Sequence, residues 1–176
     1  MALVGLGVGA AFLTFGVVGA LAGFPHFTKV TTSISTSSTS TSASTTATAS
    51  ADVTQAFLNV SFREAGLGST EGTLVRVTSD ASAVYACINR GGRNPKAANK
   101  QTVTSPVSAE DTFTSDKNGS ISGTLTAAAP GPGDFTCSSG QTLVLASVTF
   151  SNIVITDVTN GIFTTADDIT AVFFQV

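Results

Sequence analysis

The alternation of apolar and polar side chains over residues 141–157 restricts the fold of this chain more than any other feature. Four apolar side chains occupy every second position: Val144, Ala146, Val148 and Phe150. This period of two is typical of a strand with one buried face. Ile153 and Ile155 continue the pattern on the opposite parity, which predicts a bulge or turn near Ser151 and Asn152.

Further short segments with strand signals alternate with turn residues. They cover residues 53–62, 74–77, 83–88, 102–107, 121–125 and 171–176. The pair Asn118-Gly119 favours a type I′ hairpin turn, and Asn160-Gly161 marks another turn. Seven or eight strands with almost no helical periodicity predict an all-β domain over residues 52–176. We expect an antiparallel β-sandwich that is Ig-like in architecture.

The first 24 residues are almost entirely apolar and predict export. Ala20-Leu21-Ala22 fits the small-residue cleavage pattern of a signal peptide, which would leave Gly23 as the first mature residue. No Lys or Arg precedes the run, and its length would also allow an apolar helix to cross a bilayer. Residues 1–22 are therefore interpreted as a signal peptide or a membrane anchor. Membrane contact is expected only through residues 1–24, if they are uncleaved, and the protein is expected to be secreted or on the cell surface.

Ser and Thr make up 16 of the 20 residues from 31 to 50. Such a tract buries too little apolar surface to offset the entropy of ordering it, so residues 23–51 are expected to be a linker. Two alternatives remain open. The tract also has the composition of an O-glycosylated stalk. Alternatively, the β-propensity of Thr would let part of the tract add to a neighbouring subunit as an edge strand.

The overall composition removes several function classes. Only 11% of the residues are charged and the net charge is −3, which argues against a nucleic-acid partner. One His and two Cys cannot supply the four ligands of a structural zinc site. Any His-dependent triad would need His26, outside the expected domain. We expect no catalysis, no cofactor and no metal.

Cys87 and Cys137 are separated by fifty positions, and each lies in or beside an expected strand. An even number of cysteines in an exported chain favours a disulfide. Closing a loop of this length contributes about 4 kcal/mol on the chain-entropy model. Two free thiols or a redox pair are the alternatives, although the C-x-x-C spacing of a redox pair is absent.

The loop that follows Cys87 is the sequence's main candidate binding site. It carries four of the chain's eight cationic residues and several amides on a Gly-Gly segment. The candidate ligand-binding residues are Asn89, Arg90, Arg93, Asn94, Lys96, Asn99 and Lys100. Such side chains hydrogen-bond carboxylates and sugar hydroxyls, so an acidic polymer or glycan is the expected partner. The alternative is a solvated connection without a ligand.

The carboxylates and the asparagines leave further hypotheses open. A calcium site could use Asp111, Asp116, Asp157, Asp167 and Asp168, although no ligand series of the EF-hand type is present. A glycosidase pair could be drawn from these aspartates and from Glu64, Glu71 and Glu110. Solvated strand ends explain the same residues more simply. N-glycosylation sequons occur at Asn59 and Asn118, and Asn118, on a predicted exposed turn, is the better acceptor.

Three segments of the expected domain are distinctive: FREAGLGS at 62–69, YACINRGGRNPKAANK at 85–100 and CSSGQTLVLASVTFSNIVITDVTNG at 137–161. They resemble segments of uncharacterised secreted proteins of actinobacteria and fungi. The resemblance covers most of residues 56–163, implies export and a single disulfide-bearing domain, and transfers no catalytic residue. The long uncharged apolar start departs from an ordinary secretory leader.

The order of an apolar segment, a Ser/Thr-rich joint and a β-sandwich head is also similar to that of archaeal type IV pilins. No processing site of the pilin kind precedes the apolar run. The sequence therefore predicts an exported, non-catalytic surface or matrix protein that binds an acidic polymer or glycan. The alternative is a self-associating, pilin-like or strand-exchanging filament subunit.

Overall fold

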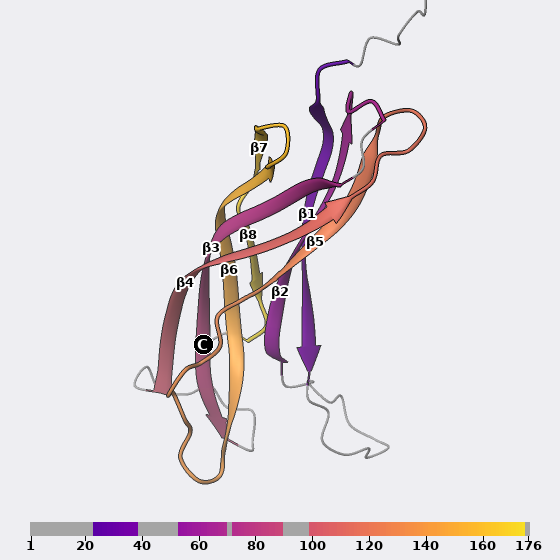
Figure 1. Ribbon diagram of the computed structural model, residues 1–176. Helices are drawn as coiled ribbons and strands as arrows, with labels where there is room; N and C mark the ends of the chain where they lie inside the picture. The colour runs from indigo at the N-terminus through magenta and orange to yellow at the C-terminus, as the bar shows by residue number, and fades with distance from the viewer. Residues whose placement is uncertain (1–22, 39–52, 70–71, 90–98, 175–176) are drawn as a thin grey trace, which may run out of the picture.

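The computed structural model describes residues 23–38, 53–69, 72–89 and 99–174 (Figure 1). These residues form eight antiparallel strands in two facing sheets, which confirms the all-β prediction. The strands are β1 (His26–Ser38), β2 (Val53–Ala65), β3 (Thr73–Asn89), β4 (Lys100–Phe113), β5 (Ile121–Ala128), β6 (Gln141–Asp157), β7 (Ile162–Ala166) and β8 (Ile169–Val172).

One sheet has the strand order β1-β2-β5, and the other has the order β4-β3-β6-β7, with β8 also paired to β6. Alternate side chains of each strand enter the space between the sheets. Leu58 and Val60 of β2 belong to the same core cluster as Val148 and Phe150 of β6, and all four are fully buried. Each buried side chain of this size contributes about 1.5–3 kcal/mol.

Strand β3 is longer than the sequence predicted. Residues 74–77 and 83–88 were expected as two strands, but they are the two ends of one strand of 17 residues. The polar residues between them resemble a turn in sequence. Ser79 nevertheless keeps the inward parity, is almost fully buried, and donates a hydrogen bond of 2.8 Å to the carbonyl of Ser151. That bond satisfies the buried hydroxyl and allows the strand to continue.

The predicted bulge in β6 is confirmed. The pairing of β3 with β6 shifts between Thr78 and Asp80, where Val154 and Ser151 are the partners. Asn152 has a φ of 52°, in the left-handed region that Asn tolerates better than most residues. This extra residue moves Ile153 and Ile155 onto the buried face.

The predicted hairpin at Asn118-Gly119 is wrong. The turn joins β4 to β5, which belong to different sheets. Gly119 has a φ of +70°, whereas Asn118 lacks the positive φ that a type I′ turn needs. The Asp116 carboxylate accepts backbone hydrogen bonds from Asn118 and Ser120 instead, and this local bonding fixes a different turn.

Part of the expected linker is a strand. Residues 26–38 form β1, which pairs with β2 along its length, so the expectation of a linker over 23–51 is wrong for this part. Val30, Thr32 and Ile34 take the inward parity, and Val30 and Ile34 pack against the core.

The predicted apolar helix lies outside the described residues. No helix in the described ranges is long and apolar enough to cross a bilayer.

The disulfide between Cys87 and Cys137 is confirmed, with a Cα–Cα distance of 5.5 Å. It joins the end of β3 to the segment that precedes β6. The same segment is held by Tyr85, whose buried hydroxyl donates a hydrogen bond of 2.8 Å to the carbonyl of Pro130.

The expected strand 171–176 corresponds to β8, which ends at Val172, while β7 was not predicted.

Candidate functional site

The loop that the sequence singled out lies mostly beyond the described residues. Arg90, Arg93, Asn94 and Lys96 fall outside them. Three of the candidates are described. Asn89 ends β3 and accepts a hydrogen bond of 3.1 Å from Gln141, Asn99 precedes β4, and Lys100 begins β4 opposite Ala86. The assignment of this loop as a binding site remains a prediction.

The outer face of the three-stranded sheet is an ordered array of polar side chains. Strand register places these outward residues in three cross-strand rows. The rows are Lys29, Arg63 and Ser122; Thr31, Ser61 and Thr124; and Ser33, Asn59 and Thr126. Most of these side chains are exposed, because the opposite parity of each strand supplies the core.

Hydrogen bonds between side chains hold part of this array in place. The hydroxyls of Ser61 and Thr124 share a bond of 2.8 Å. Asn59 donates to Ser35 at 2.8 Å and accepts from Thr126 at 2.9 Å. The sequon at Asn59 thus lies within a sheet with its amide engaged, whereas Asn118 is exposed on a turn. Glycosylation at either sequon stays a prediction.

One end of the array forms a shallow groove of about 510 Å³, which we call the cationic groove. It is lined by Lys29, Thr31, Ser61, Phe62, Arg63, Ser122, Gly123 and Thr124. Its backbone lies over packed rings: Phe62 contacts Phe27 and Phe113 edge-to-face, with ring centroids 6.1 Å and 5.1 Å apart. These contacts give the groove a rigid base.

Gly123 is required beneath the cationic groove. A Cβ atom at this position would lie 2.2 Å from the ring of Phe113. The absence of a side chain therefore lets the Phe113 ring pack under β5. A glycine within a strand usually weakens the sheet. At position 123 it is needed, because the Phe113 ring occupies the space that a side chain would fill.

The charges of the cationic groove are not balanced within it. Lys29 and Arg63 are direct cross-strand partners on one face, and neither forms an ion pair with another described residue. Backbone hydrogen bonds from Ser120 and Asn118 lower the pKa of nearby Asp116, and the positive charges of Arg63 and Lys117 lower it further. Two neighbouring cations among hydroxyl donors form a surface suited to carboxylates or sulfates.

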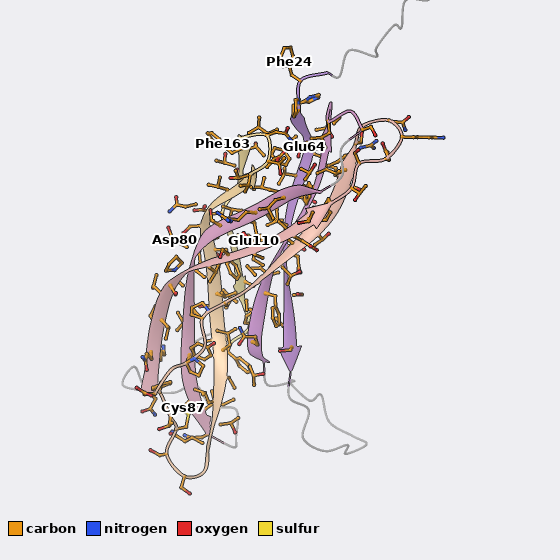
Figure 2. All side chains as sticks on the ribbon, in the orientation of Figure 1. Phe24, Glu64, Asp80, Cys87, Glu110 and Phe163 are labelled. Atoms are coloured by element: carbon orange, nitrogen blue, oxygen red, sulfur yellow. A yellow bond between two sulfur atoms is a disulfide. The ribbon has the colours of Figure 1, made fainter. Side chains whose placement is uncertain are left out.

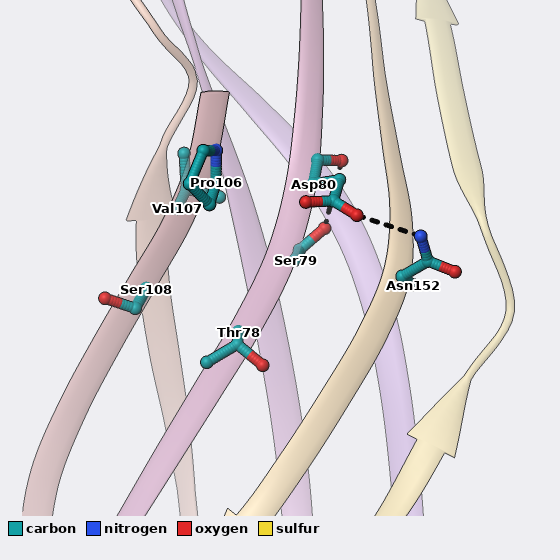
Figure 3. A pocket seen from close by; sticks show the side chains of 7 residues that line it. All are labelled: Thr78, Ser79, Asp80, Pro106, Val107, Ser108 and Asn152. Carbon is teal, nitrogen blue, oxygen red and sulfur yellow. Dashed lines mark hydrogen bonds between the residues drawn. The ribbon is translucent and has the colours of Figure 1, made fainter. Parts of the chain in front are cut away.

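The five-stranded sheet carries a second hollow of about 400 Å³, over β3, β4 and the bulge of β6 (Figure 3). Its charged side chain is Asp80, which accepts a hydrogen bond of 2.9 Å from Asn152. The backbone amide of Asn152 donates to Asp168 at 3.1 Å. These contacts stabilise the bulge and present negative charge, so this hollow is less suited to an anion than the cationic groove.

The carboxylates named as calcium or glycosidase candidates are dispersed. Asp111 lies near the end of β4, Asp116 lies in the turn after β4, and the adjacent Asp167 and Asp168 lie between β7 and β8. All four are exposed, and Glu71 is outside the described residues. Glu110 pairs with Arg76 at 2.7 Å. Within the described ranges, no three His, Cys, Asp or Glu residues are arranged to hold a metal ion. Glu64 and Asp157 are fully buried.

The sequence did not reveal Lys29 and Arg63 as a pair. Their separation along the chain is large, and Lys29 lay in the presumed linker. Alternation alone places Arg63 on the outer face of β2, but the partner strand is needed to find Lys29 beside it.

No protein-family model, curated protein or solved structure matches the chain.

Proposed function

We propose that the protein is an exported, non-catalytic surface or matrix protein that binds an acidic polymer or glycan through its cationic groove. The observation that carries this proposal is the direct cross-strand pairing of Lys29 and Arg63. Like charges at such positions destabilise a sheet. A bound carboxylate or sulfate would compensate both charges, and the adjacent hydroxyls would hydrogen-bond the same ligand.

The location of the protein rests on separate evidence. The disulfide points to an oxidising, extracytoplasmic environment. The apolar start of the chain supports export through a signal peptide or anchor. The strand order supports an Ig-like arrangement, because the first, second and fifth strands form one sheet and the remaining strands form the other. Domains of this architecture commonly act at cell surfaces.

Retention on an acidic polysaccharide tests the proposed function. The purified protein is applied to immobilised polygalacturonate, with uncharged dextran as the matched control. We expect retention on polygalacturonate alone, with elution as salt rises, because exposed charges are screened over about 10 Å at 0.1 M ionic strength. Equal retention on both matrices, or none on either matrix at low salt, would contradict the proposal.

A second function is favoured by β1. This strand lies at the edge of the three-stranded sheet, contains residues 31–38 of the Ser/Thr-rich tract, and joins β2 through residues 39–52. An edge strand on such a connection could pair instead with β2 of a second copy, which would make the protein a strand-exchanging filament subunit. Both arrangements use the same register between β1 and β2.

A designed disulfide separates the two arrangements. Ser33 and Asn59 are Cα partners of β1 and β2, so a protein carrying both Ser33→Cys and Asn59→Cys forms a cross-strand disulfide. Intrachain pairing gives monomers on a non-reducing gel. Strand exchange gives covalent dimers and a ladder of higher species, and a ladder that persists on dilution before oxidation would favour the filament subunit.

A further inference from the structure

Two carboxyl groups meet in the space between the sheets. Glu64 lies near the end of β2, on the same parity as Leu58, Val60 and Phe62, and its side chain is fully buried. Asp157 is the last residue of β6, in the other sheet, and is also fully buried. Figure 2 shows Glu64 at the end of the sandwich opposite to Cys87. The pair therefore joins the two sheets far from the disulfide.

The two carboxyls differ in their hydrogen-bond partners. Asp157 accepts bonds on both oxygens, from the backbone amide of Asn160 at 2.9 Å and from its side-chain amide at 2.6 Å. Neither oxygen of Glu64 receives a hydrogen bond from a described residue. An ionised Glu64 would thus be a buried charge without a donor, and protonation instead lets it donate to Asp157.

The surroundings reinforce the protonated form. The pKa of Glu64 is raised from its ordinary value of 4.5 to about 8. Burial is the largest cause, and the hydrogen bond to Asp157 and the negative charge of Asp157 supply the rest. The neighbours of Glu64 in register are Phe27 on β1 and Ile121 on β5. Those of Asp157 are Val75 on β3 and Ile162 on β7.

No cation faces this pair in the described part of the chain. Arg63, the adjacent residue of β2, and its partner Lys29 belong to the opposite, solvent-facing side of the sheet. Asp157 is the titratable group that acts on Glu64. Nothing positive is therefore placed to stabilise two negative charges at once.

We infer that Glu64 and Asp157 form a proton-binding site that ties the two sheets together, and that the stability it contributes is lost as the pH rises from acidic to mildly alkaline values. A divalent cation is a poorer occupant than a proton. Calcium takes about six to eight oxygens, whereas both Asp157 oxygens already accept hydrogen bonds from Asn160. This inference is independent of the cationic groove.

The direction of the pH effect follows from proton linkage. Between the ordinary pKa of a glutamate and the raised pKa of Glu64, the folded protein binds a proton that the unfolded chain does not hold. Stability from this group is therefore fully present below pH 4.5 and is lost as the pH rises to about 8. Over that interval the unfolding equilibrium constant increases by up to about tenfold for each pH unit.

Glu64→Gln tests the site, because glutamine keeps the shape and a donor while removing the titration. Urea unfolding is measured between about pH 5 and about pH 9 for the wild type, for Glu64→Gln and for Glu110→Gln, a surface control. We expect the wild type and Glu110→Gln to lose stability with rising pH, and Glu64→Gln to lose much less. Equal pH dependence in all three proteins would overturn the inference.

Two further measurements keep the test decisive if Glu64→Gln does not fold. Infrared spectra of the wild type should show a protonated carboxylic acid at about pH 6.5 that disappears at about pH 9.5. A fully ionised set of carboxylates at the lower pH would overturn the inference. So would thermal stabilisation by calcium that a chelator reverses and Asp157→Asn abolishes, because that result would assign the site to a cation.

Discussion

Lys29 and Arg63 face each other across the pairing of β1 and β2, on the solvent side of a sheet whose other outward residues are mostly hydroxyls and amides. An acidic protein with net charge −3 thus places two of its eight cations side by side. The arrangement is unfavourable for the isolated sheet. The proposed anion-binding surface would account for it, since binding sites commonly reduce stability.

Removing one of these charges should therefore stabilise the protein. We expect Lys29→Ser to raise the free energy of unfolding by about 0.2–1 kcal/mol at low salt, because the like-charge repulsion is lost. The gain should shrink at about 0.5 M salt, where the repulsion is screened. Urea titrations at both salt concentrations measure the difference, with Lys100→Ser as the control. A loss of stability that salt does not change would show that Lys29 is a packing residue instead.

The disulfide should carry much of the stability at the opposite end of the sandwich. Replacing both cysteines, Cys87→Ser with Cys137→Ser, should lower the free energy of unfolding by about 2–5 kcal/mol. Tyr85 and Pro130 would still join the same segments through their hydrogen bond. Differential scanning calorimetry measures the loss. Two titratable thiols in the denatured, unreduced wild type would contradict the pairing.

Gly119 and Gly161 provide a matched pair of turn glycines. Both have a φ of +70°, but a Cβ atom at Gly119 would lie 2.7 Å from the backbone nitrogen of Gly68, whereas Gly161 has nothing within 4 Å. Gly161→Ala should cost about 1 kcal/mol through backbone strain alone. Gly119→Ala should cost about 1–3 kcal/mol more, because the backbone itself must move. Equal losses in thermal melts would show that the contact with Gly68 is not tight.

The sequence was sufficient for the bulge near Ser151 and for the disulfide. It was not sufficient for the first half of β6, where a second register shift places Val144 and Ala146 in a different buried cluster from Val148 and Phe150. The parity change at Ser151 and Asn152 is visible in the order of apolar residues, and the structure places a bulge there. The pairing of Cys87 with Cys137 followed from the presence of two cysteines and the expectation of export. Both conclusions need only the chain itself and its cellular context.

Features that depend on partners far away in the chain were missed. The Ser/Thr content of residues 31–38 hid β1, whose apolar side chains Val30 and Ile34 are too few to mark a strand without β2 beside them. The polar residues around Ser79 resemble a turn in sequence. They form part of a strand because the carbonyl of Ser151, far along the chain, accepts the hydrogen bond of the buried Ser79 hydroxyl. The cationic groove arises only from strand register, so alternation within one strand could not reveal it.

The binding of oligogalacturonate by three proteins, measured by calorimetry at low salt, tests the central claim most directly. The three proteins are the wild type, a double variant with Lys29→Ser and Arg63→Ser, and the single variant Lys100→Ser. Lys100 is a cation of the loop after Cys87, which the sequence alone predicts as the binding site. Each charged hydrogen bond contributes about 1.5–3 kcal/mol, so the double variant should lose at least about tenfold in affinity while Lys100→Ser binds like the wild type. Unchanged binding by the double variant, with a loss in Lys100→Ser, would contradict the groove and return the site to the loop.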